Sequence, residues 1–179
     1  GFIQTLSAPM LLAFSDSATL GLAETICASG MIVSSVLVGI ISIKKGYAKI
    51  LSTTLFFAGI FMVVFGLRED LLLICISGFL FFAMLPFANS SLDYMVRTNI
   101  KNELQGRAWG LIGVISQLGF VAAYALSGVL ADYAGKALKI GVGRGAGSLI
   151  VVAGVLLSVT AVVLYQIKSV RQLEKRGVS

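Results

Sequence analysis

The stretch LLLICISGFLFFAMLPFANSSL, residues 71–92, decides which class of fold this chain adopts. It runs from Asp70 to Asp93 without a charged side chain between them. A helix needs about 20 predominantly apolar residues to cross the hydrocarbon core of a bilayer, because each residue advances it by only about 1.5 Å. The stretch lacks the alternation of apolar and polar residues that a membrane β-strand shows, so it predicts a transmembrane helix.

Four further stretches meet the same criterion, and a shorter apolar segment precedes them. The four are residues 20–43, 50–67, 109–130 and 148–167. The shorter segment covers residues 1–14. The predicted connections are residues 44–49, 68–70, 93–108 and 131–147. We therefore predict an all-α integral membrane protein, a six-helix bundle over residues 1–167 whose first helix is truncated, followed by a basic tail at 168–179.

The composition excludes the soluble classes of protein. Of the 179 residues, 58% are hydrophobic and only 12% are charged, about half the charged share of a soluble domain. A small soluble domain cannot bury so much apolar surface. The absence of histidine removes most zinc, haem and acid–base chemistry. Cys27 and Cys75 form no CxxC pair, so we predict no enzyme, no cofactor and no metal site.

The net charge is +6, and the positions of the basic residues predict how the chain is oriented in the membrane. When alternate connections are assigned to opposite sides, ten basic residues fall on one side and four on the other. The ten are Lys44, Lys45, Lys49, Arg97, Lys101, Arg107, Lys168, Arg171, Lys175 and Arg176. The four are Arg68, Lys136, Lys139 and Arg144. Because cytoplasmic loops carry the excess of Lys and Arg, we predict a multi-pass protein of the cell membrane with a cytoplasmic C-terminus, and no nucleic-acid partner.

Polar and small residues are shared unequally among the predicted helices. Polar side chains inside a membrane usually face a bundle interior or a cavity, and small residues let helices approach closely. Residues 20–43, 71–92 and 109–130 carry most of both kinds. We therefore expect three or four inner helices, these three among them, and residues 50–67 and 148–167 to be peripheral helices that face lipid.

Five polar residues in the predicted inner helices are candidates for a substrate cavity or for proton coupling. Glu24 lies one turn inside the outer end of its helix. It is expected either to bind a proton or attract a cation, or to extend its side chain to the membrane–water interface. Gln117 and Tyr124 are seven residues apart and share one helical face. They, like Ser29 and Asn89, are expected either to line a cavity or to form hydrogen bonds between helices. Outside the helices, Asp16 is expected to act as a helix cap.

Three short motifs carry a resemblance to a known family. They are NELQGRAWG at residues 102–110, GVLAD at 128–132 and GVGRG at 141–145. Together with the helix count and the sidedness of the charge, they resemble the C-terminal half, helices seven to twelve, of a major facilitator superfamily permease. More narrowly, they resemble the branch of macrolide-efflux proteins and siderophore exporters. The resemblance covers essentially all 179 residues and implies a twelve-helix transporter whose N-terminal six-helix half is missing here.

The resemblance also singles out residues of the loops. The family's loop motif, G-x-L-A-D-R-x-G-R-K, has a possible copy at residues 39–49, where Gly39, Lys44 and Gly46 match but Ile43 replaces the acidic residue. The motif implies a charge-paired latch, and a plain basic turn is the alternative. A better match to its first half, with Asp132 in the acidic position, falls on the side predicted to be outside.

The remaining candidates for a cytoplasmic gate lie around the predicted connection 93–108. Asp93 stands four residues before Arg97, a spacing that brings the two side chains onto one face. We expect a local ion pair, extended to Arg107, or a gate that opens when helices rock. Gln105 and Gly106 belong to the same group through the QGR motif.

The resemblance implies a secondary active transporter that exports small amphipathic molecules or drugs, such as macrolides, by alternating access and proton coupling. Its implied partners are the lipid bilayer, the missing N-terminal half, a small-molecule substrate and protons. Two alternatives from other classes stay open. One is a non-transporting membrane assembly or receptor subunit, and the less favoured one is a membrane-embedded lipid enzyme.

Overall fold

The computed structural model describes residues 1–41, 46–137 and 141–167. These residues contain six α-helices and no β-strand. The helices are α1 (Phe2–Leu11), α2 (Ser17–Ile40), α3 (Tyr47–Leu67), α4 (Leu71–Asn99), α5 (Asn102–Ala137) and α6 (Gly141–Gln166). Five of them are long and apolar enough to cross a membrane, and α1 is shorter. The predicted all-α membrane bundle is confirmed.

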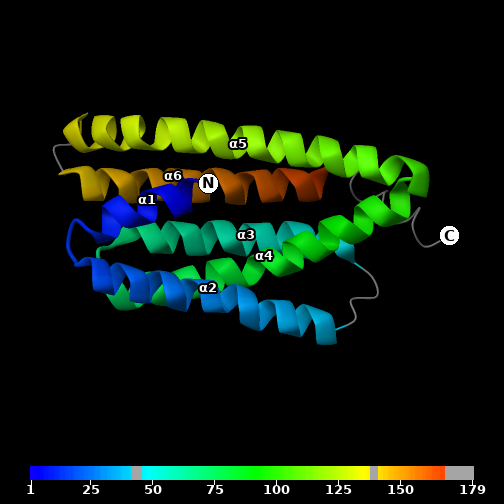
Figure 1. The fold of residues 1–179 in the computed structure, drawn as a ribbon, viewed down its shortest axis with the longest axis horizontal. Coiled ribbons are helices and arrows are strands. Elements are labelled where there is room, and N and C mark those ends of the chain that lie inside the picture. Colours follow the sequence, from blue (N-terminus) through cyan, green and yellow to red (C-terminus); the bar gives the residue numbers. More distant parts are fainter. Residues whose placement is uncertain (42–45, 138–140, 168–179) are drawn as a thin grey trace.

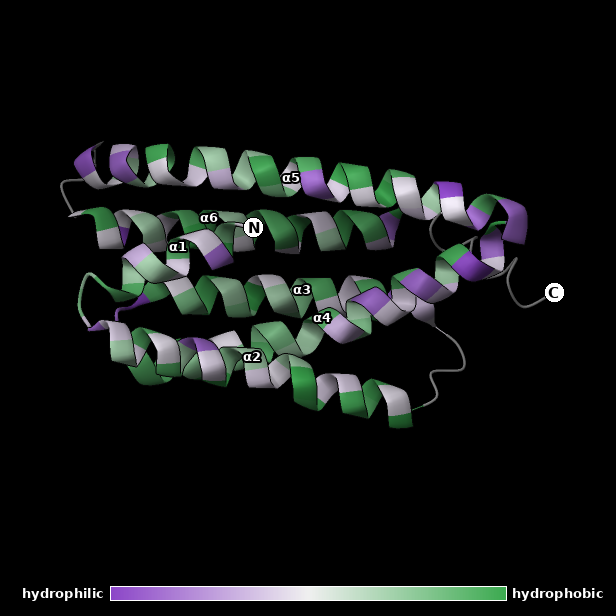
Figure 2. Ribbon diagram, viewed as in Figure 1, coloured by the Kyte–Doolittle hydropathy of each residue, from purple (hydrophilic) through white to green (hydrophobic). Residues whose placement is uncertain are grey.

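The helices run antiparallel to their sequence neighbours, in the lateral order α5, α6, α3, α4, α2 (Figure 1). The short helix α1 packs against α6 and α5. The turns that follow α1 and α3 lie at the end where α6 begins, and the turn between α4 and α5 lies at the opposite end (Figure 1). Apolar residues cover the middle of the helices, and polar residues gather near the ends (Figure 2).

Local capping explains why two helices begin three residues earlier than predicted. The Asp16 carboxylate accepts a hydrogen bond of 2.9 Å from the Thr19 amide and caps α2, which confirms the predicted helix cap. Hydrogen bonds from Thr19 lower the pKa of this carboxyl below its ordinary value. Helix α3 begins directly after Gly46, whose φ of 85° lies in the left-handed region that favours glycine.

The predicted connections 93–108 and 131–147 are wrong in length. Helix α4 continues to Asn99 and α5 already begins at Asn102, while α5 ends at Ala137 and α6 begins at Gly141. Hydropathy marks where a helix leaves the lipid, but the helix itself, with its backbone hydrogen bonds, extends beyond that point. In α4 an ion pair of 2.9 Å between Arg97 and Asp93, one helical turn apart, lies within this continuation.

Within the described bundle, residues 50–67 lie centrally and residues 20–43 and 109–130 lie at the edges, while the expectation of which helices face lipid in the whole transporter stays a prediction. Helix α3 packs along its length against both α6 and α4, and 33% of its most apolar window is buried, against 17% for α5. The hydroxyl groups carry little information about neighbouring helices, because most of them donate inside their own helix. Ser34, Ser77 and Ser91, for example, each donate to a carbonyl three or four residues earlier.

Glycine explains the close packing of α3 and α6. Four glycines form what we call the glycine seam, with Gly59 opposite Gly154 and Gly66 opposite Gly147. A Cβ atom on Gly66 would lie 2.5 Å from the Gly147 carbonyl oxygen, and one on Gly154 would lie 2.7 Å from that of Gly59. Only a residue without a side chain fits there, so the seam lets the two backbones touch.

The glycines of α2 and α5 behave differently. Gly30 of α2 packs against the Phe79 carbonyl of α4. Gly135 of α5 packs against the Gly141 carbonyl at the start of α6. A Cβ atom on any of the others would meet no heavy atom of the described residues within 4 Å. These others are Gly21, Gly39, Gly106, Gly110, Gly113, Gly119 and Gly128. The described bundle therefore leaves much of the surface of its two outermost helices open.

Candidate functional site

A cavity of about 390 Å³ lies among α1, α2, α3 and α4. Its wall is mostly apolar, with three side chains that carry oxygen or nitrogen: Gln4, Ser7 and Glu24. The apolar part consists of Ile3, Leu11, Ala23, Cys27, Ala28, Phe65, Ile74 and Phe82. Pockets that take small molecules are typically apolar with a few placed polar groups, in a volume of about 300–1,000 Å³. The cavity fits that description.

Glu24 is the one acidic residue in the wall of this cavity. It is carried by α2, whose start is fixed by the Asp16 cap two turns earlier. The ion pairs among the described residues are Arg97–Asp93 and Arg144–Glu69, so Glu24 has no cationic partner in this part of the chain. The structure thus places the residue predicted for proton coupling on a cavity and leaves its carboxylate exposed.

Tyr124 does not line the cavity itself but contacts Gln4, which does. Its hydroxyl donates a hydrogen bond of 3.3 Å to the Gln4 side-chain oxygen and so joins α5 to α1. Gln4 and Ser7 were not predicted as site residues. Their positions with Leu11, at intervals of three and four residues, place all three on one face of α1, which is the pattern that could have revealed them.

The other predicted cavity residues do not line this cavity. Ser29 is half-buried, and its hydroxyl donates to the Ile26 carbonyl of its own helix at 2.6 Å. Asn89 and Gln117 are exposed on α4 and α5. Their role in a cavity stays a prediction.

A second cavity, of about 320 Å³, lies at the opposite end of α2 and brings predicted gate residues together. Gly39 from α2 lines it with Asp93 and Arg97 from α4. Tyr47 and Tyr94 also line it, and their rings stack with centroids 3.6 Å apart. The predicted ion pair between Asp93 and Arg97 is confirmed. Lys44 lies outside the described residues.

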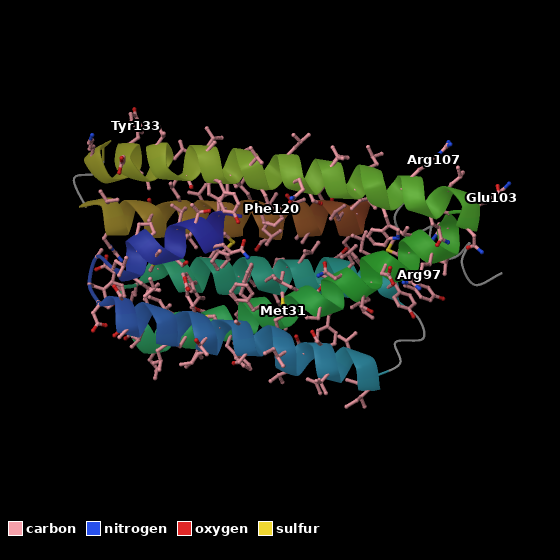
Figure 3. All side chains as sticks on the ribbon, in the orientation of Figure 1. Met31, Arg97, Glu103, Arg107, Phe120 and Tyr133 are labelled. Atoms are coloured by element: carbon pink, nitrogen blue, oxygen red, sulfur yellow. The ribbon has the colours of Figure 1, made fainter. Side chains whose placement is uncertain are left out.

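The QGR motif has three separate roles in the structure. The Gln105 side chain donates to the carbonyls of Arg97 and Ile100, at 3.2 and 3.1 Å, and so caps the end of α4. Gly106 has open space around its Cβ position. Arg107 extends from α5 away from the other helices (Figure 3) and takes part in neither ion pair of the described residues. The predicted extension of the ion pair to Arg107 is therefore wrong, because α5 presents this side chain outward.

The basic residues divide between the two ends of the bundle as the sequence predicts. Among the described residues, Lys49, Arg97, Lys101 and Arg107 lie at one end, and Arg68, Lys136 and Arg144 lie at the other. Lys45, Lys139 and the tail 168–179 lie outside the described residues. Arg144 also has a structural contact, since it donates a hydrogen bond of 3.2 Å to the Leu67 carbonyl at the end of α3.

Comparison with known proteins agrees with this architecture. The family model of the Major Facilitator Superfamily matches residues 1–178. No curated protein and no solved structure matches the chain. The family match covers nearly every residue, and the fold is a bundle of membrane-spanning helices. This chain therefore belongs to the Major Facilitator Superfamily and is a multi-pass membrane transporter.

Proposed function

We propose that the chain forms one half of a secondary transporter that exports small amphipathic molecules in exchange for protons. The observation that carries this proposal is the cavity that combines an apolar wall with a single carboxylate, Glu24. The macrolide-efflux and siderophore-exporter branch of the family is our more specific proposal, supported by the NELQGRAWG and GVLAD motifs.

The wall of the cavity supports an amphipathic substrate. Phe65, Phe82 and Ile3 offer apolar surface from three helices, while Gln4 and Ser7 offer hydrogen-bonding groups on one side. An apolar body gains by leaving water for such a wall, and a few polar contacts fix its orientation. At about 390 Å³ the cavity is at the small end of the range for drug-sized ligands.

The open faces of α2 and α5 support a second bundle as the partner of this one. Tyr124 is 50% exposed and Gln117 is exposed on the same helix as five of the open glycines. Lipid tails cannot satisfy a side-chain amide, but a neighbouring helix can. In our proposal a second six-helix half covers these faces, and the two halves rock about a site near the bilayer midplane.

The cavity that contains Gly39 is our candidate for the cytoplasmic gate. The Arg97 and Asp93 side chains that form its ion pair are 68% and 40% exposed. An exposed pair of this kind contributes at most about 1 kcal/mol. It can therefore form and break during the transport cycle at little cost, whereas a buried pair could not.

An efflux assay on the full-length protein tests the proposed function. Cells or vesicles that contain the protein are loaded with a fluorescent amphipathic drug, and its export is followed with and without a proton uncoupler. We expect export against the gradient to stop when the uncoupler is added, because the coupling energy comes from protons. Export that continues unchanged without a proton gradient contradicts the proposal.

The orientation of the bundle has its own test. We infer that the end with Lys49, Arg97 and Lys101 is cytoplasmic, from the excess of basic residues. In a variant without native cysteines, Arg68→Cys should react with a membrane-impermeant maleimide on intact cells. Lys101→Cys should react only after the membrane is permeabilised. Labelling of Lys101→Cys on intact cells reverses the orientation.

A further inference from the structure

A groove of about 180 Å³ lies between α3 and α6, at the end of the bundle where α3 begins. None of its residues lines the Glu24 cavity or the gate cavity. Its rim consists of Lys49, Thr53 and Phe56 from α3 and Val162 and Tyr165 from α6, with Ala161 at its base. The transport mechanism proposed above uses none of them.

The groove is elongated along the helix axes. Lys49, Thr53 and Phe56 follow one another at intervals of four and three residues on one face of α3, which corresponds to a length of about 10 Å. One turn beyond Phe56 the glycine seam begins, where Gly59 meets Gly154 and Ser158. Among the described residues, the groove is therefore closed by contact between the two helices at its inner end and open at the end with Lys49.

The two ends of the groove differ in chemistry. Lys49 is exposed and belongs to neither ion pair of the described residues. Toward the inner end the base is apolar, since Ala161 is 1% exposed. Ser52, which is also buried there, donates its hydroxyl to the Ala48 carbonyl at 3.0 Å, so its proton is used inside α3. Phe56 and Val162 remain partly exposed along the sides.

We propose that this groove binds one anionic phospholipid from the adjacent leaflet. The phosphate lies against the Lys49 ammonium group at the level of the headgroups, and one acyl chain lies along Phe56 and Val162. The positive charge of Lys49 favours an anionic headgroup. The apolar base of the groove favours a lipid, which has an acyl chain, over a soluble anion, which has none. A lipid in this position fills the space between α3 and α6 where the glycine seam no longer holds them together. The inference stands independently of transport.

Native mass spectrometry of the purified full-length protein tests this proposal. The protein is mixed with phosphatidylglycerol or phosphatidylcholine, and the bound lipids are counted. We expect phosphatidylglycerol to bind about fivefold more tightly, the contribution of a single surface lysine. Lys49→Gln should abolish this preference, while the matched variant Lys101→Gln, at the same end but outside the groove, should retain it. An equal preference in both variants overturns the proposal.

A second variant distinguishes the contribution of the groove's shape to lipid binding from that of the Lys49 charge. Val162→Trp fills the groove without changing the charge, and we expect it to reduce binding of both lipids. If that variant unfolds at a lower temperature, Thr53→Phe on the opposite rim serves the same purpose. Inorganic phosphate is added as a competitor in a parallel series. If it displaces phosphatidylglycerol at equal concentration, the groove is a plain anion site and the lipid proposal is wrong.

Discussion

Replacing Gly154 by valine is expected to lower the unfolding temperature of the protein by about 6–12 °C, the equivalent of about 3 kcal/mol for a chain of this size. A Cβ atom at this position would lie 2.7 Å from the Gly59 carbonyl oxygen and 2.8 Å from the Val63 amide nitrogen. Both are backbone atoms of α3, so the clash cannot be relieved by rotating a side chain. The two helices must separate, and the seam on both sides of the substitution loses contact.

The sign of this effect is diagnostic because helix propensity acts in the opposite direction. Glycine is the least favourable residue in a helix interior after proline, so replacing it by valine stabilises an isolated helix slightly. A lower unfolding temperature therefore reports packing against α3. The measurement is thermal unfolding of the purified protein, followed by intrinsic fluorescence.

The matched control is the neighbouring residue on the same helix. Val155 is 48% exposed, and Val155→Ile adds a methyl group on that open side. We expect this variant to stay within about 0.5 kcal/mol of the parent protein. If Gly154→Val and Val155→Ile unfold at the same temperature, the glycine seam does not hold α3 and α6 together.

Most of the fold could be predicted from the sequence because lipid imposes a simple rule. Any segment that crosses it must satisfy its own backbone, so long uncharged stretches such as residues 71–92 become helices. The ends of α4 and α5 could not be predicted in this way. Their last turns are polar and helical at once, and hydropathy does not distinguish a polar helix from a loop.

The number of helices could be predicted from the sequence, but the order in which they lie side by side could not. Polar side chains do not identify neighbouring helices, because most hydroxyls donate to the backbone of their own helix. The useful signal was the spacing of seven between Gly59 and Gly66 and again between Gly147 and Gly154. Two antiparallel helices with the same spacing can bring these glycines face to face.

In the candidate site, the contacts between residues close in sequence could be predicted, and the contacts between distant residues could not. The Asp93–Arg97 pair and the Asp16 cap could be predicted, since each depends on residues three or four positions apart. The meeting of Gln4 with Tyr124 could not, because the two are 120 residues apart. No local pattern states which two helices will be neighbours. Gln4 therefore emerged only from the structure.

Glu24→Gln is expected to remove accumulation of substrate against its gradient while downhill exchange continues. At a membrane potential of about 100 mV, one proton moving inward releases about 2.3 kcal/mol. Since each factor of ten in concentration costs about 1.4 kcal/mol, this energy sustains about a fiftyfold gradient of an uncharged substrate. Without a proton-binding carboxylate on the cavity, the gradient should fall toward unity. The measurement is the steady-state ratio of substrate inside and outside proteoliposomes with an imposed potential.

The controls distinguish a lost proton site from a damaged cavity. Glu103→Gln removes the same charge from an exposed position in the first turn of α5 (Figure 3) and should leave the gradient intact. Glu24→Asp keeps a titratable group and should restore part of the coupling with an altered pH dependence. Exchange down a gradient should remain in all three variants, because it requires the cavity and not the proton. If Glu24→Gln sustains the full gradient, Glu24 is not the coupling site and this part of the proposal is wrong.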